Sequence, residues 1–391
     1  MSNTAILVDF SNVYRAGEWW RSGAYLNPQT HAFSYPFAYP PSSLLLFGFL
    51  AQFDFGTAAL LWTRLGLVMF LVALLSATAV LRPDRKYLFV SIAALLFFTS
   101  YGVRIELQLG QVNLLLASLA ILSLVAHRLR QSRTSATLLA LATLLTGASA
   151  LFLLYFVVFC RDLRYLLYFL ESTVVILGMS VLVVPIQLYW IWVVKVLPTL
   201  LGAVSPMNES AMGLISLSGL GYLTPGVLAA GIFMFAVFAY RVHCKSLTNL
   251  SGLSSVAADA MFLMNSLVML LLFTRCWPQD YVWVVLPVAL FVSELLAEGV
   301  KTAYFIVVGL AAFLFNLDVY PLLSYFYYYY YYPHTAIINY DYYFPILATI
   351  PTGLVGILLM VPALIVLFIR PRATLRNRLN SRFLPNRLAR K

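Results

Sequence analysis

Charge is scarce in this chain. Only 10% of its 391 residues are charged, with 14 acidic residues against 25 Lys and Arg, whereas hydrophobic residues make up 62%. A soluble domain has about 25% charged residues on a solvated surface. With a mean hydropathy of +0.89, the composition excludes a soluble domain and predicts a polytopic integral membrane protein whose partner is the lipid bilayer.

Cysteine and the common catalytic motifs are also scarce or missing. Cys160, Cys244 and Cys276 have no CxxC or Cys/His spacing, so neither a disulfide framework nor a zinc site is predicted. The sequence has no glycine-rich phosphate loop, HExxH, GxSxG or Asp-x-Asp pair. Most classes of membrane enzyme are therefore unsupported, and we expect no metal and no other cofactor.

The formal charge of +11 is explained by membrane topology and not by nucleic-acid binding. The basic residues cluster in short loops and in a tail: 82–86, 128–133, 161–164, 241–245 and 370–391. Lys and Arg accumulate in loops on the cytoplasmic side of membrane proteins. We therefore expect a multi-pass protein of the cell membrane with these loops and the C-terminal tail, 370–391, in the cytoplasm.

Apolar runs of about 20 residues are long enough to cross a bilayer. Nine such runs are present, at 57–80, 87–103, 111–127, 166–186, 223–240, 256–274, 281–297, 302–316 and 345–369. They predict an all-α fold, with residues 1–369 forming one integral membrane domain of about nine crossings.

Three further segments do not fit a simple crossing. Basic clusters lie at both ends of 137–160, which favours a hairpin that dips into the membrane and returns, although one tilted helix is also possible. Residues 42–53 are too short to span and predict a re-entrant or interfacial helix. Residues 187–204 resemble an amphipathic helix on the outer surface.

This threading places 1–41 and the Tyr-rich loop 317–344 on the extracytoplasmic face. The outer segments contain few cations, so Arg15, Arg104 and Arg275 are candidate ligands for an anion. The tyrosines of 317–344 predict either an interfacial aromatic belt or a platform that stacks on sugar rings.

Asp9 is the one carboxylate of the polar stretch 9–17 in the first outer segment, and it is the strongest indication of chemistry. Its spacing alone is typical of an N-cap, because a helix is predicted from about Ser11 to Trp20. The sequence around it nevertheless forms part of an ordered set of motifs: Asp9-Phe10 with Tyr14 and Ala16, Tyr39-Pro40-Pro41, Leu109-Gly110-Gln111-Val112-Asn113, Asn208-Glu209-Ser210, and Trp277 ahead of Tyr281-Val282-Trp283.

In this order the motifs resemble glycosyltransferase family 87, over roughly residues 9 to 290. The resemblance implies a membrane enzyme of the C-type helical fold that transfers a sugar from a polyprenyl-phosphate donor to a glycolipid or polysaccharide acceptor. Mannosyltransferases and arabinofuranosyltransferases are among the members of this family. It places the general base on Asp9. The substrate-binding candidates are Tyr14, Arg15, Tyr39, Arg104, Gln111, Asn113, Asn208, Arg275 and Trp277.

Two departures from the family pattern leave alternatives open. Thr146-Gly147-Ala148-Ser149 stands where the family usually has a lysine and a proline, and Trp277-Pro278-Gln279-Asp280 lacks the usual histidine. The segment before Asp9 is also too short to span, so a first helix is expected upstream of Met1 unless the N-terminus crosses without one. The alternatives are a non-catalytic member that binds polyprenyl lipid or assists glycan assembly, and a secondary transporter.

Overall fold

The computed structural model describes residues 7–27, 33–202, 215, 223–248, 255–272, 278–297, 357, 359–361 and 364. Helix is the regular secondary structure of these residues, and the β feature among them is an isolated bridge between Leu26 and Phe33. The predicted all-α class is therefore confirmed for the described part of the chain.

The helices follow the apolar runs closely. Their bounds are α1 Val8–Arg21, α2 Leu44–Leu50, α3 Phe55–Leu81, α4 Lys86–Thr99, α5 Tyr101–Leu109, α6 Asn113–Arg128, α7 Ser132–Leu145, α8 Leu163–Val181, α9 Ile186–Ile191, α10 Leu197–Gly202, α12 Thr224–Thr248, α13 Ser255–Leu272 and α14 Val282–Ala297. Shorter 3-10 or π segments are η1 Pro41–Ser43, η2 Pro83–Arg85, η3 Gly147–Phe152, η4 Leu154–Phe159, η5 Trp192–Val196 and η8 Pro278–Tyr281. The predicted runs 302–316 and 345–369, the loop 317–344 and the tail 370–391 lie outside the described residues or almost entirely so.

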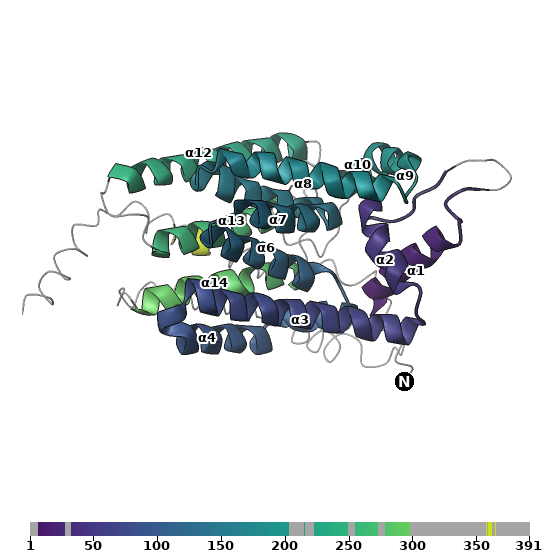
Figure 1. The fold of residues 1–391 in the computed structure, drawn as a ribbon. Helices are drawn as coiled ribbons and strands as arrows, with labels where there is room; N and C mark the ends of the chain where they lie inside the picture. The colour runs from purple at the N-terminus through teal and green to yellow at the C-terminus, as the bar shows by residue number, and fades with distance from the viewer. Residues whose placement is uncertain are drawn as a thin grey trace, which may run out of the picture.

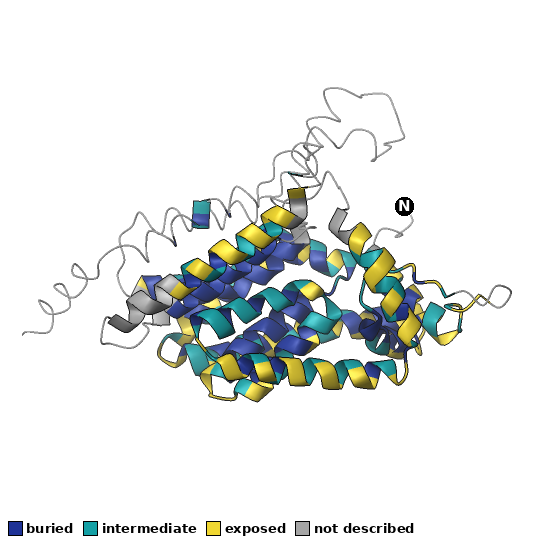
Figure 2. Cartoon of the chain, turned by 90° about the horizontal axis from the view of Figure 1, so that it is seen from above, coloured by how far each residue is buried: buried dark blue, intermediate teal, exposed yellow. Residues whose placement is uncertain are grey.

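Helix α6 forms the centre of the bundle, with α3, α7 and α14 packed around it (Figure 1). Nearly all of its side chains are buried, including the polar Ser118 and Ser123. A helix that is apolar or small on every side has no face that favours water, so burial on all sides is its stable position. Figure 2 shows the same arrangement, with buried residues in the middle of the bundle and exposed ones on its outer helices.

The outer helices α3 and α8 expose apolar side chains, among them Val68, Leu71 and Val174. Such a surface is unfavourable in water and favourable against lipid. By length and composition, α3 and α8 can each cross a membrane, and the pair α4 and α5, bent by 60°, makes a third candidate among the described residues. The chain is thus a helical membrane protein, while the number of nine crossings stays a prediction.

The segment 137–160 does not form one continuous helix. Helix α7 ends at Leu145, and Thr146 adopts an extended conformation with φ −146° and ψ 129° before η3 and η4 begin. The alternative of a single tilted helix is therefore wrong, and the hairpin that dips into the membrane stays a prediction. Residues 42–53 contain η1 and α2, and 187–204 contain α9 and α10, as short helical pieces.

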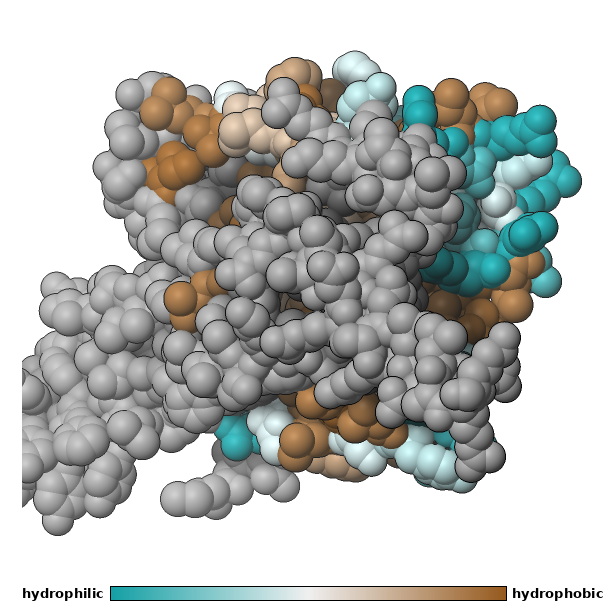
Figure 3. All heavy atoms as spheres, turned by 90° about the vertical axis from the view of Figure 1, so that its left-hand side faces the viewer, coloured by the Kyte–Doolittle hydropathy of each residue, from teal (hydrophilic) through white to brown (hydrophobic). Residues whose placement is uncertain are grey.

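The basic loops 82–86, 128–133 and 161–164 all lie at one end of the bundle, the end away from α1 (Figure 1). Figure 3 faces this end and shows hydrophilic side chains gathered in one region of it, beside hydrophobic ones. Collection of the basic loops at one end is what the positive-inside rule requires of a cytoplasmic face.

One of these basic residues has a structural position that loop composition does not predict. Arg82, 5% exposed, forms an ion pair with Asp259 of α13, which is 3% exposed. Its Nε lies 3.5 Å from Oε2 of Glu294 on α14, and Arg85 Nη1 lies 2.9 Å from the same oxygen. Arg82, Asp259 and Glu294 are buried and Arg85 is partly exposed. These four residues, called here the ion-pair cluster, join the α3–α4 connection to α13 and α14.

Candidate active site

Asp9 lies in the first turn of α1, where the positive end of the helix dipole stabilises the negative charge of its carboxylate. It is not the N-cap, because Leu7 occupies that position and no side chain caps the helix. The N-cap interpretation of Asp9 is therefore wrong. Its carboxylate instead accepts a hydrogen bond from Gln111, with 2.6 Å between Oδ2 and Nε2.

Gly110 brings Gln111 to this position. It ends α5 with φ +69°, a left-handed conformation that glycine adopts at little cost. A Cβ added to Gly110 would lie 2.7 Å from Cβ of Phe10, the neighbour of Asp9, so α1 packs directly against this turn. The backbone of Leu7 also donates to the carbonyl of Gln108 over 2.7 Å. Both contacts hold the start of α1 against the α5–α6 turn.

Asn113, the first residue of α6, connects Gln111 to two more carboxylates. Its Nδ2 lies 3.0 Å from Oε1 of Gln111, 2.7 Å from Oδ1 of Asp280 and 3.2 Å from Oε2 of Glu106. Its Oδ1 accepts from Nε1 of Trp283 over 3.3 Å. These residues, Asp9, Glu106, Gln111, Asn113, Asp280 and Trp283, are called here the acid–amide cluster.

The hydrogen-bond count at Asn113 has a chemical consequence. An amide nitrogen carries two hydrogens, whereas three oxygens lie within hydrogen-bond distance of it. The three oxygens therefore share two hydrogens, and a proton on Glu106 or Asp280 would satisfy the surplus acceptor. The other oxygen of Glu106 accepts from the backbone N–H of Leu114 over 2.9 Å, which fixes this carboxyl against the start of α6.

Tyr39, just before η1, lies close enough to the cluster to feel its charges. Burial raises the pKa of its hydroxyl, and the negative charges of Glu106, Asp9 and Asp280 raise this pKa further. The phenol therefore stays protonated at any physiological pH and is a hydrogen-bond donor. Its ring packs against Phe47 of α2 with 5.3 Å between centroids, which holds it in place.

Gln111, Asn113 and Tyr39 were predicted as site residues. The structure brings Gln111 to Asp9, Asn113 to Gln111, and Tyr39 close enough for the charge of Asp9 to act on its hydroxyl. Tyr14 is placed differently: its hydroxyl donates to the carbonyl of Phe53 over 2.8 Å, and its ring packs on Phe10 and Phe55. Its observed contacts are those of a packing residue.

The predicted cations occupy exposed positions where the structure describes them. Arg15 is exposed on α1, and Arg104 is exposed on α5 with its guanidinium carbon 5.2 Å from the centre of the Tyr101 ring. Asn208, Arg275 and Trp277 lie outside the described residues.

Glu106, Asp280 and Trp283 are members of the cluster that sequence reasoning did not place in the site. Glu106 precedes Gly110 by four residues. A glycine at the end of a predicted helix indicates a turn, and this turn brings Glu106 to Asn113, so Gly110 could have indicated the contact from sequence. Asp280 is 167 residues from Asn113 and Trp283 is 170 residues from it. No sequence pattern encodes contacts across such separations.

Among the described residues, no group of three or more His, Cys, Asp or Glu side chains is placed to hold a metal ion. The fold and the cluster together define a class: a helical membrane protein with buried acids, held by side-chain amides, at the end of the bundle opposite its basic loops. A model of glycosyltransferase family 87 matches residues 37–266.

That match covers more than half of the 391 residues, and the chain belongs to glycosyltransferase family 87, as its motifs predicted. It is thus a membrane glycosyltransferase by family. Tyr39, Glu106, Gln111 and Asn113 lie inside the matched segment, whereas Asp9 and Asp280 lie outside it. Among curated proteins no match to the chain is found.

Proposed function

We propose that this protein transfers a sugar of the mannose or arabinofuranose kind from a polyprenyl-phosphate carrier to a glycolipid or glycan acceptor. The reaction takes place at the outer face of the cytoplasmic membrane, and Asp9 is the general base. The observation that supports this most is the hydrogen bond from Gln111 to Asp9 within a cluster anchored by Asn113. It holds one carboxylate in a fixed orientation at the end of the bundle opposite the basic loops.

The chemistry requires one base and no strong acid. An acceptor hydroxyl loses its proton to Asp9 as its oxygen attacks the anomeric carbon, while the bond to the phosphate oxygen breaks. The polyprenyl phosphate leaves as a stabilised anion and needs no proton. A single in-line displacement inverts the anomeric centre, unlike glycoside hydrolysis by a pair of carboxyl groups.

Gln111 and Tyr39 have supporting roles in this proposal. Gln111 uses an Nε2 hydrogen on Asp9, so one carboxylate oxygen is fixed and the group is oriented for proton transfer. The protonated Tyr39 hydroxyl is available to donate to a substrate oxygen near the three carboxylates. Arg104 and Arg275 remain candidates for the donor phosphate, because a guanidinium binds phosphate oxygens well.

The test is transfer of labelled sugar from polyprenyl-phosphate mannose, and from the arabinofuranose equivalent, in membranes that contain the full chain. We expect transfer by the wild type and a loss of about 10²–10⁴ in rate for Asp9→Asn, because removal of a general base costs this much. Asp54→Asn is the matched control. Asp54 caps α3 through the N–H of Thr57, a role that asparagine also fills.

A non-catalytic family member is the alternative that a specific observation favours, because the segment Thr146-Gly147-Ala148-Ser149 has no cation. In that case the wild type would bind polyprenyl phosphate but transfer no sugar from either donor. Equal transfer by wild type and Asp9→Asn would instead contradict the assignment of the base while leaving the enzyme class intact.

A further inference from the structure

Two buried polar side chains near the acid–amide cluster have no hydrogen-bond partner among the described residues. Asn265 of α13 is 1% exposed, and neither its Nδ2 nor its Oδ1 is bonded within the part of the chain that is described. Ser149 of η3 is fully buried, and its Oγ is in the same situation. A buried polar group left unbonded costs about 1–3 kcal/mol, so each such group in a native protein needs an explanation.

The two side chains lie on the same contact surface between η3 and α13. Phe152 packs on Phe262 with 5.0 Å between ring centroids. Ser149 precedes Phe152 by three residues, and positions i and i+3 of a 3-10 helix are eclipsed. Asn265 follows Phe262 by three residues and therefore lies on the same face of α13. Both polar groups thus lie about one turn from one aromatic contact.

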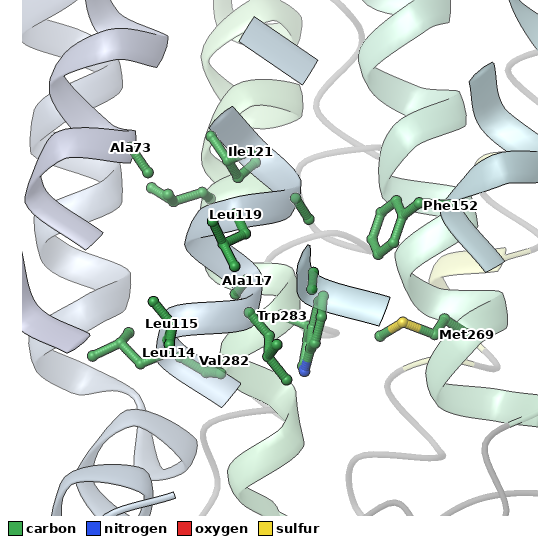
Figure 4. Packing of buried hydrophobic residues seen from close by; sticks show 14 of the residues in the cluster. Ala73, Leu114, Leu115, Ala117, Leu119, Ile121, Phe152, Met269, Val282 and Trp283 are labelled. Carbon is green, nitrogen blue, oxygen red and sulfur yellow. The ribbon is translucent and has the colours of Figure 1, made fainter. Parts of the chain in front are cut away.

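This surface borders Trp283. Figure 4 shows Trp283 with Leu115 of α6 on one side and with Phe152 and Met269 on the other. Met269 follows Asn265 by four residues, so the two share the face of α13 that is turned toward Trp283. Phe152 lies 5.9 Å from Trp283 between ring centroids, nearly parallel to it. The indole N–H of Trp283 donates to Oδ1 of Asn113 over 3.3 Å, so this residue contacts both the acid–amide cluster and the η3–α13 surface.

We propose that Asn265 and Ser149 form an uncharged subsite, beside the face of Trp283 on which Phe152 stacks, that binds hydroxyl groups of the donor's sugar ring. This inference rests on the proposed function and adds to it a position for the sugar. With the acceptor hydroxyl at Asp9, the donor's anomeric carbon meets it there and the hydroxyls of the donor ring reach farther into the bundle, toward α13.

The chemistry of the subsite fits a sugar better than a phosphate. An asparagine side chain has two donor hydrogens and an accepting oxygen, and a serine hydroxyl both donates and accepts, which matches neighbouring hydroxyls on one ring. The surrounding side chains Phe152, Phe262 and Met269 are apolar. Burial of an unpaired phosphate among them would be far more costly than burial of a neutral sugar.

The decisive variant is Asn265→Leu, which keeps the size of the side chain and removes its amide. If the Asn265 amide binds a ligand, it is unsatisfied in the unliganded protein. The unliganded variant should therefore be at least as stable as the unliganded wild type, because a buried group without a hydrogen-bond partner has been removed. We expect the unfolding temperature of the full chain in detergent to stay equal or rise. The KM for the donor should rise about tenfold, with a smaller change in kcat, since one or two hydrogen bonds are lost.

Binding experiments distinguish recognition of the sugar from recognition of the lipid carrier. We expect polyprenyl-phosphate mannose or arabinofuranose to raise the unfolding temperature of the wild type more than sugar-free polyprenyl phosphate does. Asn265→Leu should lose this extra increment and keep the sugar-free one, and Ser149→Ala should reduce it. Ser266→Ala is the control, because Ser266 is buried on the same helix and donates to the carbonyl of Phe262; its increment should be that of the wild type.

The inference is overturned if Asn265→Leu keeps the sugar increment, or if it lowers the unliganded unfolding temperature while the donor KM is unchanged. The first outcome would mean that the sugar binds elsewhere, and the second that Asn265 is a structural residue. Neither outcome touches the proposed function, which stands or falls on sugar transfer and on Asp9. A wild type that binds the sugar-bearing lipid but transfers nothing would sink the function and leave the subsite.

Discussion

The two ends of the bundle bury acidic side chains in different ways. In the ion-pair cluster, Asp259 and Glu294 are neutralised by Arg82 and Arg85 in the same place. In the acid–amide cluster, Asp9 accepts from the amide of Gln111, and Glu106 accepts from the amide of Asn113 and from a backbone N–H. The first arrangement cancels charge, whereas the second orients carboxyl groups by neutral donors.

The difference teaches which cluster serves the fold and which serves the reaction. An arginine that pairs with acids from two other helices fixes those helices and occupies the oxygens of both acids. An amide donates a hydrogen bond without cancelling charge, so the carboxylate keeps its negative charge while its orientation is fixed. Substitutions should therefore affect stability at the ion-pair cluster and rate at the acid–amide cluster.

The largest effect is expected at Asp9. Asp9→Asn should lower the rate of sugar transfer by about 10²–10⁴ and leave the unfolding temperature of the protein nearly unchanged, because asparagine keeps the shape and Gln111 can still donate to its oxygen. Thermal unfolding in detergent, measured beside transfer, checks both parts. A large loss of stability would show that Asp9 belongs with Asp259 as a structural acid.

The reverse is expected at Arg82. Arg82→Met should reduce the free energy of unfolding by about 3–5 kcal/mol, because two acids are left buried without this partner. The transfer rate per folded molecule should change little. The double variant Arg82→Met with Asp259→Leu should recover part of the stability, since the unpaired acid is removed with its partner. If Arg82→Met alone unfolds with the same free energy as the wild type, the ion-pair cluster does not stabilise the fold, and the contrast between the two clusters is wrong.

Gly110→Ala should show how far the site depends on the α5–α6 turn. A left-handed alanine costs about 1–2 kcal/mol, and the contact of its Cβ with Phe10 adds about 1–3 kcal/mol of overpacking. We expect a lower unfolding temperature and a lower transfer rate together. Gly147→Ala is the control, because a Cβ there would meet no atom within 4 Å. A stable and fully active Gly110→Ala would contradict the close packing of α1.

Gln111→Leu removes the amide that orients Asp9. We expect a loss of about tenfold in transfer rate with the base still present, since one charge-assisted hydrogen bond contributes about 1.5 kcal/mol. Transfer assays of both variants give the check: Gln108→Leu, on the exposed side of α5, should leave the rate unchanged, and an unchanged rate in Gln111→Leu would contradict the orienting role.

The smallest effect is expected from Glu106→Gln. Glutamine has the shape of the carboxyl group and brings hydrogens to a cluster with a surplus of acceptors around Asn113, so transfer should change by less than about threefold. Transfer assays across pH give the check. A loss of a hundredfold or more would mean that the negative charge of Glu106 takes part in the reaction, and the surplus proton would then belong to Asp280.

The sequence alone determined the fold class and most of the helices. Long apolar runs with few charges can satisfy their backbone groups in lipid only as helices, and seven of the runs coincide with α3, α4, α6, α8, α12, α13 and α14. The order of short motifs also pointed to the family and to Asp9, Tyr39, Gln111 and Asn113, because these residues lie near turns that the local sequence specifies.

Only the tertiary structure decided which residues meet. Asp280 and Trp283 reach Asn113 because α14 packs beside α6, and Arg82 is buried because α13 and α14 bring acids to it across 177 and more residues. The clustering of basic residues assigned Arg82 to a cytoplasmic loop, and local spacing made Asp9 a possible cap. Both roles depend on partners supplied by distant helices, and helix packing, which follows from the shapes of whole surfaces, sets those partners.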